Sequence, residues 1–214
     1  MANRITLALL GLLAAAACTA GELDVSVIDR SGRGVAEAVV TVDPIDAPRP
    51  IPQAAAAAMD QKDLAFVPRV LVVAVGTNVD FPNNDAVSHQ VYSFSPAKKF
   101  QLPLYKGQAH PPVNFDRKGL VVLGCNIHDE MAGYIYVTDA SFFGKTDASG
   151  TWKLAGLAAG DYRITVWSPL IADAPSTLTL TQHVNEDVTR TRVQLTRDLR
   201  VRPEPRPRRS DWEY

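Results

Sequence analysis

A succession of short apolar runs, separated by turn-forming residues, is the strongest constraint on the fold. Leu23, Val25 and Val27 alternate with polar residues, which is the period of a strand with one buried face. Residues 70–75 form a continuous apolar run, typical of a strand buried on both faces. After residue 20, no stretch of ten or more residues has the periodicity of an amphipathic helix. The sequence therefore predicts an all-β protein of sandwich or barrel type.

Other apolar runs predict further strands, and glycine, asparagine, aspartate and proline mark the turns between them. The segment 54–58 is polyalanine and lies beside a proline-rich linker, so it is open to two interpretations, a helical turn or an extended edge. We expect turns at 29–34, 147–150 and 157–162. The remaining predicted strands are 39–42, 79–81, 87–94, 113–115, 120–123, 134–137, 151–154, 163–167, 178–180 and 188–193.

The N-terminus has the pattern of a secretory signal peptide. Arg4 precedes an apolar run over residues 5–17, and small residues follow. We expect cleavage after Ala20; in the alternative, a lipoprotein signal, Cys18 becomes acylated. Either way Cys125 is the one free thiol of the mature chain, and no intramolecular disulfide is possible. No other segment is apolar enough to predict a membrane span.

The charge distribution argues against a nucleic-acid partner. The formal net charge is −1, and no basic stripe with interleaved aromatic residues occurs in the folded part. The tail at 197–214 is rich in arginine and proline, a composition that predicts disorder.

The segment GCNIHDEMAGYIYV (124–137) carries the clearest chemistry. It places Cys125, His128 and Met131 three residues apart. A thiolate, an imidazole and a thioether together are a copper ligand set. Zinc stays open as an alternative, because Asp129 or Glu130 offers it a harder fourth ligand.

A type 1 copper site needs a second histidine in its trigonal plane. His89, in FPNNDAVSHQVYSF (81–94), follows a predicted turn and leads a predicted strand. His110 is the alternative ligand if His89 does not bind the metal, and His183 is expected to be exposed. Four histidines in all are too few for a multicopper oxidase, and one mature cysteine excludes a two-cysteine binuclear centre. We therefore expect one copper ion and no enzymatic activity.

These motifs resemble those of the plastocyanin and amicyanin group of cupredoxins. GTNVDFPNND (76–85) matches the family pattern Gly-x-x-Val-x-Phe-x-Asn-x-Asp before the first histidine, and the loop has the short Cys-x2-His-x2-Met spacing of amicyanin. The resemblance covers about 54–138 and implies a Greek-key sandwich with one type 1 copper ion. It also implies His89, Cys125, His128 and Met131 as the ligands. Gly124 and Gln90 depart from the family pattern, which often has an aromatic residue and asparagine there.

The flanking segments resemble a carboxypeptidase regulatory-like domain, a small transthyretin-like sandwich. The resemblance is carried by DVSVIDRSGRGVAEAVVTV (24–42) and TDASGTWKLAGLAAGDYRITVWSP (146–169). The layout is similar to that of bacterial proteins of the plastocyanin-like or methylamine-utilisation type, with the cupredoxin inserted in or flanked by the sandwich. The expected divisions are a signal peptide (1–20), the first strands of the sandwich (21–48), the cupredoxin (49–140), the rest of the sandwich (141–196) and the tail (197–214).

Together these features predict a periplasmic blue copper protein that carries single electrons between redox partner proteins. Two alternatives remain at this point. One is a non-redox copper storage or delivery protein that uses the same ligands. The other is a structural or interaction sandwich with a vestigial site.

Overall fold

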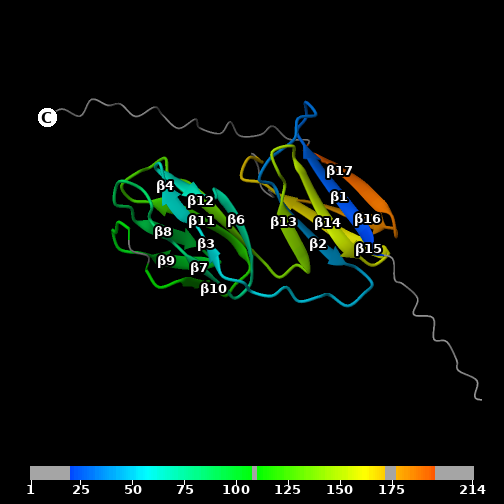
Figure 1. The fold of residues 1–214 in the computed structure, drawn as a ribbon, viewed down its shortest axis with the longest axis horizontal. Helices are drawn as coiled ribbons and strands as arrows, with labels where there is room; N and C mark the ends of the chain where they lie inside the picture. The colour runs from blue at the N-terminus through cyan, green and yellow to red at the C-terminus, as the bar shows by residue number, and fades with distance from the viewer. Residues whose placement is uncertain (1–19, 108–109, 172–176, 196–214) are drawn as a thin grey trace, which may run out of the picture.

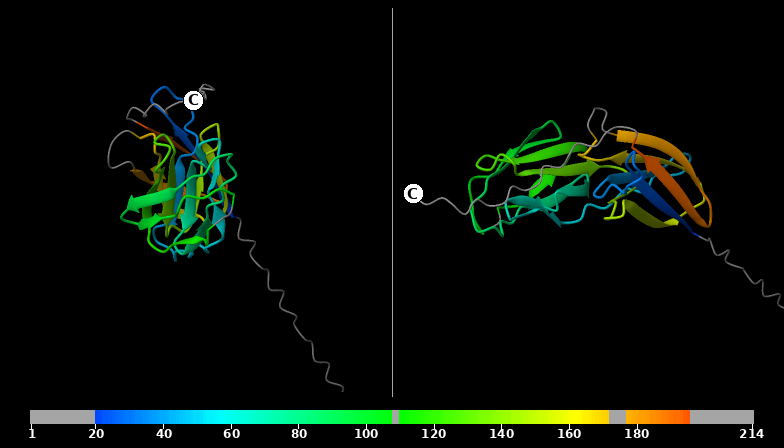
Figure 2. Two further views of the ribbon diagram at one scale, coloured as in Figure 1. Left: turned by 90° about the vertical axis from the view of Figure 1, so that its left-hand side faces the viewer. Right: turned by 90° about the horizontal axis from the view of Figure 1, so that it is seen from above.

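The computed structural model describes residues 20–107, 110–171 and 177–195. Within these ranges the chain is all-β, with strands β1 to β17 and no helix. The strands form two lobes that lie end to end (Figures 1 and 2). We call them the terminal lobe, built from residues 21–44 and 142–195, and the central lobe, built from residues 57–138. The predicted all-β architecture is confirmed.

The terminal lobe consists of two sheets, ordered β14-β1-β17 and β13-β2-β15-β16. Leu23, Val25 and Val27 of β1 are fully buried and pack against the apolar face of the second sheet, including Val42 and Ile164. The alternation read from the sequence thus gives one buried face. The strands are β1 (Gly21–Ile28), β2 (Val39–Pro44), β13 (Phe142–Lys145), β14 (Thr151–Leu157), β15 (Gly160–Trp167), β16 (Thr177–Val184) and β17 (Val188–Gln194).

The central lobe is built around a five-stranded sheet ordered β6-β12-β11-β8-β9, facing a small sheet ordered β10-β7-β3. Phe81, Phe100 and Phe115 contact one another in its core, with ring centroids 5.5 to 6.5 Å apart. The strands are β3 (Ala57–Ala58), β4 (Asp60–Lys62), β5 (Ala65–Val67), β6 (Val70–Ala74), β7 (Thr77–Asp80), β8 (Val91–Ser95), β9 (Lys98–Gln101), β10 (Val113–Phe115), β11 (Gly119–Cys125) and β12 (Ala132–Thr138).

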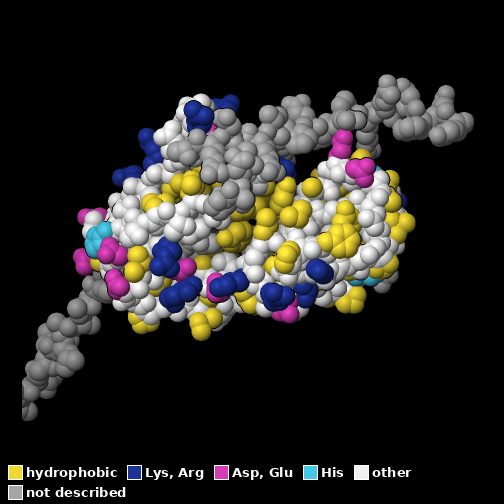
Figure 3. Space-filling model, turned by 180° about the vertical axis from the view of Figure 1, so that it is seen from behind, with side chains coloured by type: hydrophobic (Ala, Val, Ile, Leu, Met, Phe, Trp, Pro, Cys, Tyr) yellow, Lys and Arg dark blue, Asp and Glu magenta, His cyan; other side chains and the backbone are white. Residues whose placement is uncertain are grey.

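The central lobe is an insertion, because the chain leaves the terminal lobe after β2 and returns to it at β13. The two lobes share a small core of their own, in which Val39, Val70 and Trp167 are buried. The Trp167 indole contacts the rings of Tyr134 and Tyr136, with centroids 5.8 and 5.5 Å away. Figure 3 shows hydrophobic side chains gathered in the middle of one face, where the lobes meet. The outer face of the five-stranded sheet is therefore covered at the lobe junction.

The structure decides one open local prediction and corrects two others. Of the segment 54–58, Ala57–Ala58 forms strand β3 beside β7, so the extended interpretation is right. The strand predicted over 87–94 begins only at Val91, because Asn83 holds the preceding loop by donating from Nδ2 to the Val87 and Tyr105 carbonyls. The predicted turn at 157–162 is shorter, since β15 begins at Gly160.

The predicted signal peptide, Cys18 and the arginine-rich tail at 197–214 lie outside the described residues, apart from Ala20. A helix of the length and hydropathy required to cross a membrane does not occur in the described part of the chain.

Candidate metal centre

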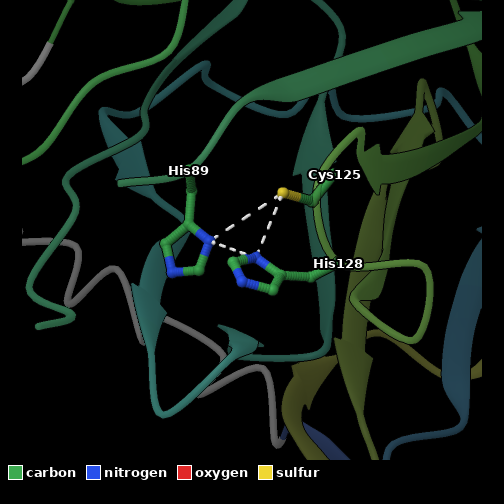
Figure 4. A group of neighbouring side chains, drawn as sticks. All are labelled: His89, Cys125 and His128. Carbon is green, nitrogen blue, oxygen red and sulfur yellow. Dashed lines mark hydrogen bonds between the residues drawn. The ribbon is translucent and has the colours of Figure 1, made fainter. Parts of the chain in front are cut away.

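Three of the predicted donors meet at one end of the central lobe (Figure 4). Cys125 is the last residue of β11, His128 lies in the loop that follows, and His89 lies two residues before β8. Both histidines turn Nδ1 toward the sulfur, at 3.8 Å from His89 and 3.7 Å from His128. The two Nδ1 atoms are 3.1 Å apart. The structure thus brings together two segments that are 36 residues apart in the chain.

Strand register explains why these segments meet. In the antiparallel pair β8–β11, Cys125 is opposite Val91, so His89 lies just beyond the same end of the sheet. The His89 backbone exchanges two hydrogen bonds with Tyr105, of 2.9 and 3.0 Å. The His89 side chain is fully buried. Its position is therefore fixed by the sheet and by a neighbouring loop.

The triangle of donor atoms has the size that a metal ion requires. With sides of 3.1, 3.7 and 3.8 Å, its three corners lie about 2.1 Å from a common centre, close to the metal–nitrogen bond of about 2.0–2.1 Å known for zinc sites. Two imidazole nitrogens and one thiolate in a trigonal arrangement are the in-plane ligands of type 1 copper.

Met131, the fourth predicted ligand, is buried next to this group in the sequence. Its side chain is 2 % exposed and belongs to the same apolar cluster as Cys125. The Met131 backbone N–H donates to the His128 carbonyl at 3.0 Å, which closes the loop between the two residues. Asp129 and Glu130 are exposed, and no carboxylate joins the group within the described residues. This soft donor set fits a single type 1 copper ion and gives zinc no hard fourth ligand.

Three solved structures that are similar to parts of this chain are a cupredoxin, an amicyanin and a copper-containing nitrite reductase. A purple cupredoxin from Nitrosopumilus maritimus is 23 % identical, with a TM-score of 0.35, over 38 % of this chain and 99 % of that one. An amicyanin variant in the reduced state is 22 % identical, with a TM-score of 0.35, over 46 % of this chain and 99 % of that one. A copper-containing nitrite reductase from Thermus scotoductus SA-01 is 24 % identical, with a TM-score of 0.37, over 45 % of this chain and 25 % of that one. No protein-family model and no curated protein matches this chain.

Asp85 is a site residue that the sequence reasoning missed. Its Oδ2 atom lies 2.9 Å from His89 Nε2, and both side chains are buried. A hydrogen bond from Nε2–H to this carboxylate holds the proton on Nε2 and leaves the Nδ1 lone pair free for a metal. The signal available in the sequence was an aspartate four residues before the histidine, inside the motif used for the resemblance.

Asp85 remains a carboxylate in spite of its burial. Burial alone would raise its pKa, but hydrogen bonds from the Leu64 N–H, from His89 and from the Ala86 N–H outweigh this effect. The pKa of Asp85 therefore lies below its usual value. A charged acceptor makes a stronger hydrogen bond than a neutral one, so His89 is held in one tautomer and one orientation.

His128 is the half-buried member of the group. Burial, and then the neighbouring His89, lower its pKa, while Asp85 opposes the change. The imidazole is therefore neutral over a wider pH range than a free histidine, which is the state that a metal requires.

A buried polar network supports the His89 side of the site. Gln61 donates from Nε2 to the Pro82 carbonyl at 3.0 Å and also bonds to the Tyr105 hydroxyl. The hydroxyl in turn donates to the Phe81 carbonyl at 2.5 Å. Tyr105 thereby ties His89 to the segment that follows β7. On the other side, Gln90 accepts a hydrogen bond of 2.6 Å from Asn126, so this departure from the family pattern links the two donor segments.

The remaining histidines lie apart from the donor group. The His110 ring packs edge-on against Tyr105, with centroids 4.6 Å apart, and does not replace His89. His183 lies within β16, is exposed as expected, and pairs with Asp161 at 2.7 Å between Nδ1 and Oδ1.

Proposed function

We propose that this chain is a periplasmic cupredoxin that carries single electrons between partner proteins. His89 and His128 would hold one copper ion through their imidazoles, Cys125 through its thiolate and Met131 through its thioether. The observation that carries the proposal is the triangle of donor atoms, which already has the dimensions of a metal site. Copper in such a site alternates between Cu(II) and Cu(I), storing and releasing one electron.

The protein residues around the site favour this role because they limit movement. His89 is held by the Asp85 carboxylate and by two backbone hydrogen bonds to Tyr105. Cys125 and Met131 are buried among apolar side chains, which exclude water from the sulfur ligands. A site whose ligands are already in place changes little when the charge of the metal changes. The half-buried His128 ring offers a path between the site and the surface.

Electrochemistry separates electron transfer from storage or delivery. The copper-loaded protein should show a reversible one-electron couple and fast self-exchange between its oxidised and reduced forms. Rapid loss of copper to a chelating acceptor, with no reversible couple, would instead indicate a storage or delivery protein. A melting temperature that copper leaves unchanged would indicate a vestigial site, because any ligand bound by the native state stabilises it.

A further inference from the structure

Gly124, the residue before Cys125, lets an aromatic ring lie directly against the backbone. Gly124 is opposite Tyr92 in the β8–β11 pair. A Cβ atom built on Gly124 would lie 2.7 Å from the Cζ and hydroxyl oxygen atoms of Tyr92, closer than any side chain permits. The tyrosine ring therefore occupies the space over Gly124 and lies one peptide unit from the cysteine ligand.

Tyr92 leads on to a second aromatic ring at the surface. Phe94 is two residues further along β8, so both side chains are on the outer face of the sheet. Their ring centroids are 5.1 Å apart, and Phe94 is 73 % exposed. A continuous path of bonded and touching atoms thus runs from Cys125 through Gly124 and Tyr92 to solvent. Such a path supports electron tunnelling better than an equal distance through water.

Basic side chains surround the exposed end of this path. Phe94 lines a shallow hollow of ≈ 630 Å³ at the turn between β8 and β9. Lys98, Lys99 and Arg117 contribute three positive charges to its lining, and Asp116 contributes one negative charge. Asp116 is paired with Lys98 at 3.1 Å, which leaves Lys99 and Arg117 in excess. By contrast, the exposed residues that follow His128 are Asp129 and Glu130.

We propose that an acidic redox protein docks on this hollow and delivers its electron through Phe94 and Tyr92. The inference rests on the proposed function and adds an entry point distinct from His128. In the step, the reduced centre of the partner loses one electron and Cu(II) becomes Cu(I), with no bond made or broken and no proton transferred. Opposite charge steers the partner to Lys99 and Arg117, and the exposed Asp129 beside His128 disfavours an acidic partner at that end.

The first test maps where an anion binds and needs no electron transfer. The probe is the paramagnetic trianion hexacyanochromate(III), added to the isotope-labelled full chain in both its Cu(I) and metal-free forms. We expect line broadening at the amides of Phe94, Lys99 and Arg117, and none there with the cation hexaamminechromium(III). Broadening confined to residues 126–131, or spread over the terminal lobe, would overturn the proposal.

The second test measures reduction of the Cu(II) protein by the anion hexacyanoferrate(II) in a stopped-flow instrument. At low ionic strength the double variant Lys99→Glu/Arg117→Glu should react more slowly by about tenfold or more, and high salt should close the gap. Arg192→Glu, which changes an exposed arginine of the terminal lobe, is the matched control and should react like the parent. Equal rates for the double variant and the parent at low salt would contradict the docking site.

The role of the ring is tested separately. Tyr92→Leu should slow reduction by hexacyanoferrate(II), whereas Tyr92→Phe should restore the parent rate, with the visible spectrum and potential unchanged in both. If Tyr92→Leu reacts as fast as the parent, the path is wrong. A chain without any reversible copper couple would refute the proposed function instead, while the anion map of the metal-free chain would still test the surface.

Discussion

At the scale of single residues, the chemistry of the site depends on which nitrogen of His89 carries the proton. Asp85 decides this, because its buried carboxylate accepts from Nε2 at 2.9 Å. The same carboxylate accepts a hydrogen bond from the Leu64 N–H at 2.7 Å. Its position is therefore fixed independently of the imidazole that it orients. A metal would meet an Nδ1 lone pair that is already aimed at it.

Replacing Asp85 by asparagine should therefore weaken copper binding without abolishing it. The amide offers a weaker, uncharged acceptor to Nε2–H, and loss of such an outer partner costs about 10–100-fold in metal affinity. Competition titration of copper against a chelator of known affinity measures the change. Asp116→Asn is the matched control, because Asp116 is exposed and pairs with Lys98 away from the site. An affinity that Asp85→Asn leaves unchanged would show that His89 needs no carboxylate.

Sequence reasoning at the scale of residues named the three side chains that the structure brings together, but not the residues that support them. Cys125, His128 and Met131 lie in one loop with regular spacing, so their pattern is visible in the chain itself. Asp85 and Gln61 act through contacts that exist only after folding: Gln61 is 21 residues from the carbonyl to which it donates. A glutamine in a polar segment carries no sign of complete burial.

At the scale of elements, the turn after β1 depends on one aspartate. Asp29 accepts hydrogen bonds from the backbone and side chain of Ser31 and from the backbone and guanidinium of Arg33, at 2.7 to 2.9 Å. The Ser31 hydroxyl is the strongest cause, and together these donors lower the pKa of Asp29 to about 2 from 3.8. The turn is therefore stabilised by the charged form.

This shift predicts a pH-dependent contribution to stability. Because the folded pKa is depressed, the contribution is complete above 3.8 and is lost as the pH falls toward 2. Asp29→Asn should lower the free energy of unfolding at pH 7, and the deficit should shrink between pH 4 and pH 2. Urea unfolding at each pH measures it. Asp46→Asn, at an exposed loop position, should show no such trend; a deficit for Asp29→Asn that is constant with pH would contradict this account.

Two loops of the terminal lobe pack closely where Gly34 lies against Ser149. A Cβ atom on Gly34 would overlap the backbone carbonyl oxygen of Ser149, whereas at Gly32 it would meet nothing. Gly34→Ala should therefore cost about 2–3 kcal/mol of unfolding free energy through overpacking. Gly32→Ala is the matched control: its φ of 84° costs about 1–2 kcal/mol by conformation alone. Equal thermal stability of Gly34→Ala and the parent would show that the two loops separate freely.

Elements were predictable where one face is buried and apolar, and less so elsewhere. The alternation in β1 and the apolar run of β6 are visible in the sequence. The three-residue strand β5 was not predicted. Strands β4, β9 and β13 were not predicted either, because they are short and contain charged residues or glycine. Their pairing with β5, β8 and β2 respectively provides the hydrogen bonds that define them. The partner of β13 is distant in the sequence, whereas β4 and β9 pair with strands next to them in the chain.

At the scale of the whole molecule, the core shared by the two lobes makes the stability of each lobe depend on the other. Trp167 belongs to β15 of the terminal lobe but packs against Tyr134 and Tyr136 of the central lobe. Lys145 Nζ adds a hydrogen bond of 2.5 Å to the Val70 carbonyl across the same junction. The insertion is thus held by packing as well as by its two chain connections.

Trp167→Ala should uncouple the lobes. Truncating a buried tryptophan lowers the free energy of unfolding by about 3–5 kcal/mol. Here the contacts that are lost are those between the two lobes. We expect the parent to unfold in one calorimetric transition and the variant in two, of which copper raises only one. Leu178→Ala, a half-buried position within the terminal lobe, is the control and should lower stability while retaining one transition. A single transition in Trp167→Ala, raised as a whole by copper, would contradict the role of the junction.

The most direct test of the account is the visible absorption and electron paramagnetic resonance spectrum of the protein with one equivalent of Cu(II). Bonding of the Cys125 thiolate in a trigonal plane with His89 and His128 predicts an intense blue thiolate-to-copper band and an unusually small copper hyperfine splitting. The Cys125→Ser variant should lack both. A pale spectrum with ordinary hyperfine splitting in the parent, or a blue band that survives in Cys125→Ser, would contradict the type 1 copper site.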